Sequence, residues 1–359
     1  MRSFDEAPFL VIWEVTQACD LACVHCRASA VPERHSLELT TEEGFHLLGQ
    51  IRAFGNPLMV FTGGDPLKRP DLLPLLRRSV ELGLRTTVTP SATPLLTEAA
   101  VEAFQQCGVA RMAVSIDGPD AGSHDGFRRV SGSFGRTVEA LRHARRIGLP
   151  TQVNTTVTRH NLERLSEIAD LVEREGACLW SVFFLVTTGR ALRADDLDAS
   201  EYEEVFRLLF ERSKNAPFDI KTTEAQHYRR FVAQRQKAGG PAKRGDLLGG
   251  SIGRQAGIND GKGFVFVSHT GDIFPSGFLP LAAGNVRSDS LAEVYRRSPL
   301  FLALRDSSRL GGKCGACEYR NLCGGSRSRA YALTGDFLNE DPRCLYEPPE
   351  MASFAAKRF

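Results

Sequence analysis

The sequence has no long apolar stretch, no excess of charge of one sign and no basic leader. None of its apolar runs reaches the roughly 20 residues that cross a membrane. The 45 Lys and Arg residues are balanced by 43 Asp and Glu, so the net charge is only +2 and gives no reason to expect nucleic acid as a partner. Asp5 and Glu6 stand where a secretion signal is basic. We therefore expect a cytoplasmic protein that binds neither membranes nor nucleic acids.

Repeats and low-complexity tracts are also absent, but cysteine is abundant, with nine residues. Structural disulfides are rare in a reducing compartment, so clustered cysteines there indicate metal or redox chemistry. Seven of the nine fall into two tight groups. The other two, Cys107 and Cys178, stand alone beside apolar neighbours and are predicted to be ordinary core residues.

Residues 9 to 215 alternate between strand-like and helix-like segments. Thr40 and Glu43, for example, form a capping box before a helix from Gly44 to Ala53. Six successive β–α units predict parallel strands with right-handed crossovers, which is an α/β fold with a closed or partial barrel. Polar residues that follow the strands of a barrel gather at one mouth. The expected strands are Phe9–Val15, Leu58–Thr62, Leu84–Thr89, Arg111–Ile116, Gln152–Val157 and Leu179–Leu185.

Three regions are expected along the chain. Residues 1–237 form the barrel. Residues 238–263 are rich in glycine and are either a flexible linker or a loop placed against the active site. Residues 264–359 form a small cysteine-bearing domain that begins with a hairpin and contains a helix over Leu291–Arg297.

The first cysteine group, Cys19, Cys23 and Cys26, has the spacing Cys-x3-Cys-x2-Cys and follows the first expected strand. Three thiolates on one short loop can hold a [4Fe–4S] cluster and leave one of its four irons without a protein ligand. An open iron is a place where a substrate or cosubstrate can bind. Zinc is the competing metal, but a structural zinc site needs four ligands, and His25 between two of the cysteines is an awkward fourth.

The spacing and its place after a strand resemble the signature of the radical S-adenosylmethionine (SAM) superfamily. The resemblance implies a partial (β/α)6 barrel in which SAM chelates the open iron of the cluster. One electron, from a donor such as flavodoxin or ferredoxin, then cleaves SAM to methionine and a 5′-deoxyadenosyl radical, which abstracts hydrogen from the substrate. The cofactor supplies the difficult chemistry, while the protein supplies position and excludes water.

The same resemblance implies a set of SAM contacts. Gly63, Gly64 and Asp65 stand where the family has a Gly-Gly-Glu-Pro turn, so their backbone and the Asp65 carboxylate would hold the SAM amino group. Ser115 and Asp117 match a Ser-x-Asp after the fourth strand. For Ser115, Asn154 and Arg190 the alternative is an ordinary role in a turn or on the protein surface. The contacts expected to the ribose and to the methionyl carboxylate are Asn154 and Arg190.

The second cysteine group supplies four thiolates, which close a coordination shell completely. Spacing alone suits structural zinc and a fully ligated [4Fe–4S] cluster about equally. A separate C-terminal cysteine segment in an iron–sulfur enzyme resembles the SPASM domain of radical SAM proteins, which implies an auxiliary [4Fe–4S] cluster. Its ligands would be Cys314, Cys317, Cys323 and Cys344.

Two serines mark a departure from that domain. Full SPASM domains hold two auxiliary clusters, but Ser276 and Ser326 stand where ligands of the nearer cluster are expected. A hydroxyl is a much poorer iron ligand than a thiolate. We therefore predict one auxiliary cluster, with the space of the nearer one open to substrate.

The segment from Gly311 to Tyr346 looks most like radical SAM proteins of d1 heme and alternative heme synthesis. This implies hydrogen abstraction from a propionate side chain of a tetrapyrrole. The rival within enzymes is a maturase that modifies a ribosomal peptide, since many SPASM proteins do so. A different class is a non-catalytic iron–sulfur electron carrier, but a carrier needs no open iron and no Gly63-Gly64 turn.

Overall fold

The computed structural model describes residues 4–237 and 257–349. Its centre is a curved sheet of ten strands in the order β10-β9-β8-β1-β2-β3-β4-β5-β6-β7. The strands from β8 through β7 pair in parallel, and β9 and β10 add an antiparallel extension. They are β1 (Leu10–Glu14), β2 (Leu58–Thr62), β3 (Arg85–Val88), β4 (Arg111–Ser115), β5 (Thr151–Val157), β6 (Leu179–Phe184), β7 (Asp219–Thr223), β8 (Phe264–Val267), β9 (Asp272–Phe274) and β10 (Gly284–Asn285).

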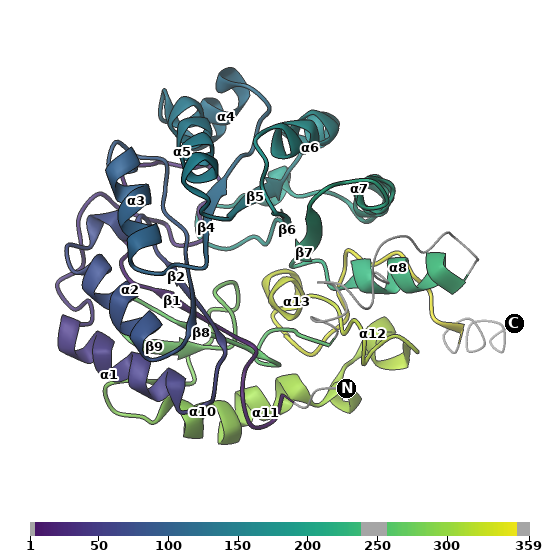
Figure 1. The fold of residues 1–359 in the computed structure, drawn as a ribbon. Coiled ribbons are helices and arrows are strands. Elements are labelled where there is room, and N and C mark those ends of the chain that lie inside the picture. Colours follow the sequence, from purple (N-terminus) through teal and green to yellow (C-terminus); the bar gives the residue numbers. More distant parts are fainter. Residues whose placement is uncertain (1–3, 238–256, 350–359) are drawn as a thin grey trace, which may run out of the picture.

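Helices cover the outer face of this sheet (Figure 1). The connections between parallel strands carry α1 (Thr41–Arg52), α2 (Leu72–Glu81), α3 (Glu98–Gln106), α4 (Ala121–Arg128), α5 (Ser133–Ile147), α6 (Leu165–Arg174), α7 (Ala199–Ser213) and α8 (His227–Lys237). The C-terminal part adds α10 (Leu291–Arg297), α11 (Pro299–Arg305), α12 (Gly312–Ala316) and α13 (Arg327–Thr334). None of the helices in the described part of the chain is long and apolar enough to cross a membrane.

The core lies between the sheet and the outer helices. Trp13 of β1 and Phe61 of β2 are fully buried and pack against each other, with ring centroids 5.8 Å apart. Leu47 of α1 and Leu75 of α2 are buried in the same cluster. The predicted capping box is present, since Thr40 Oγ1 accepts from the Glu43 amide and the Glu43 carboxylate accepts from the Thr40 amide. Apolar burial on one face thus leaves the inner face of the curve for polar chemistry.

The predicted α/β partial barrel is confirmed, but the sheet is larger than six strands. β7 adds a seventh parallel strand, and β8 pairs in parallel with β1, so that Leu10 lies opposite Phe264. The Gly263 carbonyl accepts hydrogen bonds from the Phe9 and Leu10 amides. The expected boundary at residue 264 therefore falls within one continuous sheet. Most of the glycine-rich region, residues 238–256, lies outside the described residues.

Candidate active site

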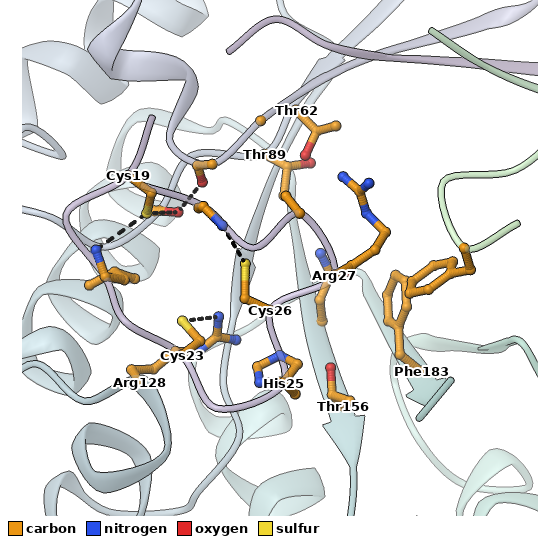
Figure 2. A pocket seen from close by; sticks show the side chains of 18 of the residues that line it. Cys19, Cys23, His25, Cys26, Arg27, Thr62, Thr89, Arg128, Thr156 and Phe183 are labelled. Atoms are coloured by element: carbon orange, nitrogen blue, oxygen red, sulfur yellow. Dashed lines mark hydrogen bonds between the residues drawn. The ribbon is translucent and has the colours of Figure 1, made fainter. Parts of the chain in front are cut away.

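Three cysteines of the loop between β1 and α1 share one pocket. Cys19, Cys23 and Cys26, hereafter the loop site, line a cavity of about 200 Å³ at the C-terminal ends of the strands. Figure 2 shows their side chains on one side of this pocket, with Arg27 and Phe183 on the other. The strand ends between these two walls contribute Thr62, Gly63, Gly64, Thr89, Ser91, Asn154 and Thr156.

Arg190 holds the cysteine loop in place. Its guanidinium donates to the Cys23 carbonyl over 3.0 Å and to the Ala30 carbonyl over 2.8 Å, and its amide donates to the Cys26 carbonyl over 2.9 Å. Gly189 lets the chain come this close, because a Cβ there would lie 2.3 Å from the Cys26 carbonyl oxygen. Arg190, which was expected at the methionyl carboxylate, is thus engaged by the backbone of the loop.

The glycine pair lies against the opposite side of the same loop. A Cβ on Gly63 would lie 2.6 Å from the Thr16 carbonyl oxygen, and one on Gly64 would lie 2.4 Å from that of Ala18. The Gly64 and Asp65 amides donate to these two carbonyls over 2.8 and 2.6 Å. Glycine is required here for close packing of two backbone segments, which fixes the loop relative to β2.

The Asp65 carboxylate is buried away from the pocket. It accepts from Thr93 Oγ1 over 2.6 Å and from the amides of Leu67 and Ser91 over 3.1 and 3.3 Å. Burial raises the pKa of Asp65, although these hydrogen bonds oppose the rise. The carboxylate therefore fastens the turn after β2 to the segment after β3, and it does not line the pocket that the cysteines share.

The remaining expected contacts come from β4 and β5. Asn154 lines the pocket, and Ser115 lies directly opposite it in the parallel register but outside the lining. Asp117 is fully buried, accepts from the Thr156 amide over 2.8 Å, and forms an ion pair with Arg128. Sequence reasoning missed Arg128, which lies on the C-terminal turn of α4, because nothing local indicates that it reaches the cysteines.

The pocket wall beside the cysteines is arranged for a bound anionic group. His25 Nδ1 and Arg128 Nε are buried without hydrogen-bond partners in this structure. Burial and the neighbouring Arg128 hold the pKa of His25 well below its usual value, so the ring is neutral and stacks on Phe127. Burial also raises the pKa of Cys19 to about 11. Three thiols with an unmet arginine donor and an unpaired imidazole nitrogen beside them fit a metal–sulfur cluster, whose binding would deprotonate the thiols.

The far wall of the pocket is aromatic. Phe183 of β6 and Phe278 both line it, with ring centroids 6.3 Å apart. Arg27 lies next to them and pairs with Glu14 beneath the pocket. Its guanidinium also donates to the Gly277 carbonyl over 3.2 Å. The C-terminal part of the chain therefore closes the side of the pocket that faces the cysteines.

The second group of cysteines, hereafter the C-terminal site, lines a smaller cavity that is also bordered by His227 and Arg230. Backbone amides of the same segment donate to three of its sulfurs, over 3.3 to 3.4 Å. Arg327 Nη2 donates to the Cys314 sulfur over 3.5 Å. Such donors stabilise thiolates that hold iron–sulfur clusters. The four cysteines that meet in this cavity are Cys314, Cys317, Cys323 and Cys344.

A single zinc ion is the alternative to a cluster at either cysteine site. A tetrahedral zinc with Zn–S bonds of about 2.3 Å draws its sulfurs to within roughly 4 Å of one another. Among residues 4–237 and 257–349, no three His, Cys, Asp or Glu side chains converge closely enough to hold one metal ion.

The space beside Ser276 and Ser326 is filled, so the prediction that it is open to substrate is wrong. Both side chains are buried, at 2% and 0% exposure. Ser326 Oγ donates to the Glu224 carboxylate over 2.6 Å, and Ser328 Oγ donates to Asp260 over 2.7 Å and lies 3.5 Å from Ser276 Oγ. In full SPASM domains a second auxiliary cluster is expected beside these two positions. In this chain a buried network of hydrogen bonds fills that space instead.

The two isolated cysteines differ. Cys107 at the end of α3 is buried in the core, as predicted. Cys178 is exposed, so its assignment to the core is wrong. Cys178 directly precedes β6. Its sulfur lies 3.1 Å from the carbonyl oxygen of Thr151, the first residue of β5.

The sequence profile of the radical SAM superfamily matches residues 13–172, which span β1 to α6 and include the loop site. The chain belongs to this superfamily and is an enzyme that uses a [4Fe–4S] cluster and SAM. An AdoMet-dependent heme synthase of Methanosarcina barkeri is 40% identical over 97% of this chain and 99% of its own length. Another, from Nitratidesulfovibrio vulgaris, is 42% identical over 95% of this chain and 93% of its own.

The fold also matches a solved enzyme structure. SuiB of Streptococcus suis, solved with S-adenosylmethionine bound, superposes with a TM-score of 0.72 at 19% identity and covers 95% of this chain and 78% of that chain. The expected resemblance to radical SAM enzymes and to their heme-synthesis branch is confirmed. The electron-carrier alternative is thereby excluded.

Proposed function

We propose that the loop site holds the SAM-binding [4Fe–4S] cluster and that SAM lies between it and the ends of β2 to β5. Bound SAM and the reduced cluster supply a 5′-deoxyadenosyl radical that abstracts hydrogen from substrate. Gly63, Gly64 and Asn154 line the pocket and are the residues proposed to approach SAM directly, whereas Ser115 lies next to Asn154 outside the lining and is proposed as a more distant contact. In this proposal Asp65 and Asp117 act through neighbours, because their carboxylates are already bonded to protein. Arg190 holds the cysteine loop through Nε and Nη1, while its Nη2 is buried without a partner and is the nitrogen that remains for the expected contact with the methionyl carboxylate.

We further propose that the C-terminal site holds an auxiliary [4Fe–4S] cluster. The support is a cavity lined by all four cysteines, with backbone amides and one arginine donating to their sulfurs. A complete set of four thiolates leaves no iron open to substrate. The thiolates of both sites require a reducing compartment, which suits a cytoplasmic enzyme that takes electrons from a flavodoxin or ferredoxin.

The proposed substrate is an iron tetrapyrrole with propionate side chains, from which the enzyme abstracts hydrogen as part of heme-type synthesis. The observation that carries this is the near full-length similarity to two proteins named AdoMet-dependent heme synthase. The aromatic wall of Phe183 and Phe278 suits a flat macrocycle, because ring stacking needs extended apolar faces. Its position opposite the cysteines would direct one edge of such a ring toward SAM.

The test is anaerobic incubation of the reconstituted enzyme with SAM, dithionite and iron coproporphyrin III. The hydrogen atom passes to 5′-deoxyadenosine, and the substrate radical releases carbon dioxide and one electron to leave a vinyl group; in this proposal an oxidised iron–sulfur cluster accepts that electron. We expect 5′-deoxyadenosine, carbon dioxide and the vinyl porphyrin to form together, as measured by liquid chromatography and mass spectrometry. A Phe183→Ala variant should weaken porphyrin binding by at least about 0.5–1.5 kcal/mol, the contribution of an aromatic pair, while SAM cleavage without substrate continues. An unchanged porphyrin beside abundant 5′-deoxyadenosine would refute the proposed substrate and leave the enzyme class intact.

A further inference from the structure

An arginine far from the cysteine loop in sequence makes direct contact with one cysteine sulfur. Arg128 Nη1 donates to the Cys23 sulfur over 3.5 Å (Figure 2). Its Nη2 forms an ion pair with the Asp117 carboxylate. The Arg128 side chain is 12% exposed and that of Asp117 is fully buried. The guanidinium is therefore a largely desolvated positive charge held next to a cluster ligand.

The geometry of this contact is fixed on both sides. The backbone of α4 pairs with the loop around Cys23, because the Ala22 amide donates to the Arg128 carbonyl and the Val24 amide donates to the Phe127 carbonyl. These two bonds flank Cys23 in sequence. They hold the backbone of Arg128 next to the loop, so the guanidinium stays within reach of the Cys23 sulfur.

Asp117 is equally fixed. Its carboxylate accepts from the Thr156 amide over 2.8 Å, and its carbonyl accepts from Asn161 Nδ2 over 3.0 Å. A carboxylate that is anchored by β5 in this way can orient the guanidinium toward Cys23. The ion pair also offsets the cost of burying either charge alone.

Reduction adds one negative charge to an iron–sulfur cluster. A cationic donor on a ligand sulfur stabilises the more negative, reduced form more than the oxidised form, which raises the reduction potential. We propose that Arg128, positioned by Asp117, is a redox-tuning residue that makes the SAM-binding cluster easier to reduce. This inference rests on the proposed role of Cys23 as a cluster ligand.

The C-terminal site provides an internal reference. Arg327 Nη2 makes the equivalent contact with the Cys314 sulfur at the same distance of 3.5 Å. Its Nη1 donates to the carbonyls of Phe337 and Asn339 rather than to a carboxylate. A change at Arg128 should therefore alter the potential of one cluster only. The unaltered cluster reports that the protein is otherwise intact.

The experiment compares wild type with Arg128→Gln, Arg128→Lys and the double variant Asp117→Asn/Arg128→Gln. The double variant leaves no unpaired buried carboxylate, so it keeps the test possible where the single variant loads poorly. Each protein is reconstituted anaerobically, its iron is counted, and its clusters are titrated by EPR-monitored potentiometry without SAM. The cluster of the loop site is identified as the signal that a Cys19→Ala/Cys23→Ala/Cys26→Ala protein lacks.

We expect Arg128→Gln to make reduction of the loop-site cluster roughly tenfold less favourable, which is a shift of about 59 mV to lower potential for one electron. The double variant also removes the more distant negative charge of Asp117, so it should shift in the same direction by less. Lysine keeps the charge and should recover most of the shift. The C-terminal cluster should keep its potential. SAM cleavage by the glutamine variants should be slow with dithionite and restored by the stronger reductant titanium(III) citrate, a rescue that a purely structural defect would not allow.

Two results would overturn the inference. One is a fully loaded Arg128→Gln protein whose loop-site potential equals that of wild type. The other is failure of both glutamine proteins to load this cluster while wild type loads it, which would make Arg128 an assembly residue. Wild-type protein that holds no cluster on the loop cysteines would instead refute the proposed function itself, so the two failures are distinguishable.

Discussion

The two cysteine sites use the same ligand chemistry in opposite settings. The loop site has three thiols at the edge of a pocket whose far wall is aromatic. The C-terminal site has four thiols around a small cavity that they share with few other groups. In the proposed assignment, a four-iron cluster at the loop site would keep one coordination position free, whereas one at the C-terminal site would have all four irons bound to cysteine. The difference teaches that ligand count and pocket shape together, rather than cysteine content, separate a reactive cluster from a closed one.

The largest expected effect comes from removing the loop site. A Cys19→Ala/Cys23→Ala/Cys26→Ala protein should form no 5′-deoxyadenosine, because no cluster remains to chelate SAM. It should still hold about four irons, against about eight in wild type. Iron and sulfide assays with product chromatography measure both quantities. Loss of all iron from this variant, or one zinc in its place, would show that the C-terminal site holds no independent cluster.

The reciprocal change is Cys323→Ala/Cys344→Ala at the C-terminal site. We expect about four irons to be lost, while the loop-site cluster stays and SAM is still cleaved slowly without substrate. Turnover of the porphyrin substrate should fall far more than this uncoupled cleavage. Cys107→Ala is the matched control, since it removes a buried thiol that belongs to neither site. Uncoupled cleavage that disappears in the double variant would contradict the independence of the sites.

A smaller effect should follow from crowding the turn behind the loop site. Gly64→Ala places a Cβ 2.4 Å from the Ala18 carbonyl oxygen, so one backbone segment must move. We expect a loss of about 1–3 kcal/mol in stability and poorer loading of the loop-site cluster. Gly49→Ala on α1 is the control, because its Cβ meets nothing within 4 Å and should stabilise the helix by up to about 1 kcal/mol. Equal effects of the two substitutions would sink the packing argument.

The smallest expected effect concerns the buried polar network that contains Glu224 and Ser326. Burial raises the pKa of Glu224 from 4.5 to about 8, and Asp260 adds to the rise. A raised carboxyl pKa stabilises the folded state below the unfolded pKa, and this stability is lost as the pH rises through about 8. The melting temperature of wild type should therefore fall between pH 6 and 9, and that of Glu224→Gln should fall less. Glu33 is exposed, so Glu33→Gln serves as the control, and its melting temperature should change with pH as that of wild type does. If the melting temperatures of Glu224→Gln and wild type fell in parallel with pH, the raised pKa of Glu224 would be refuted.

Much of the barrel could be predicted because its signals are local. The Leu58–Thr62 strand is an apolar run that ends in two glycines, and its observed bounds agree with the prediction. β7 was missed because Asp219–Thr223 contains only one apolar residue and is held by pairing with β6. Short strands that depend on a neighbour leave little trace in sequence.

The cysteine groupings were also accessible from sequence, since each lies within a short loop or segment. The roles of the polar residues were not. Asp65 bonds to Thr93 and Asp117 to Arg128, and both partners are brought in by the fold rather than by sequence proximity. Ser276 likewise lies in a filled network because Asp260 and Ser328 meet there. Tertiary contacts decide which polar groups face the pocket and which fasten its walls.

The central claim is that the chain holds one open and one closed cluster, and EPR spectroscopy with SAM tests it most directly. Dithionite-reduced wild-type protein and the Cys19→Ala/Cys23→Ala/Cys26→Ala protein are each recorded with and without SAM. We predict that SAM changes one of two cluster signals in wild type and changes nothing in the variant, whose remaining signal matches the unaffected one. A SAM-dependent change that persists in the variant, or a wild-type spectrum with a single cluster, would contradict the claim.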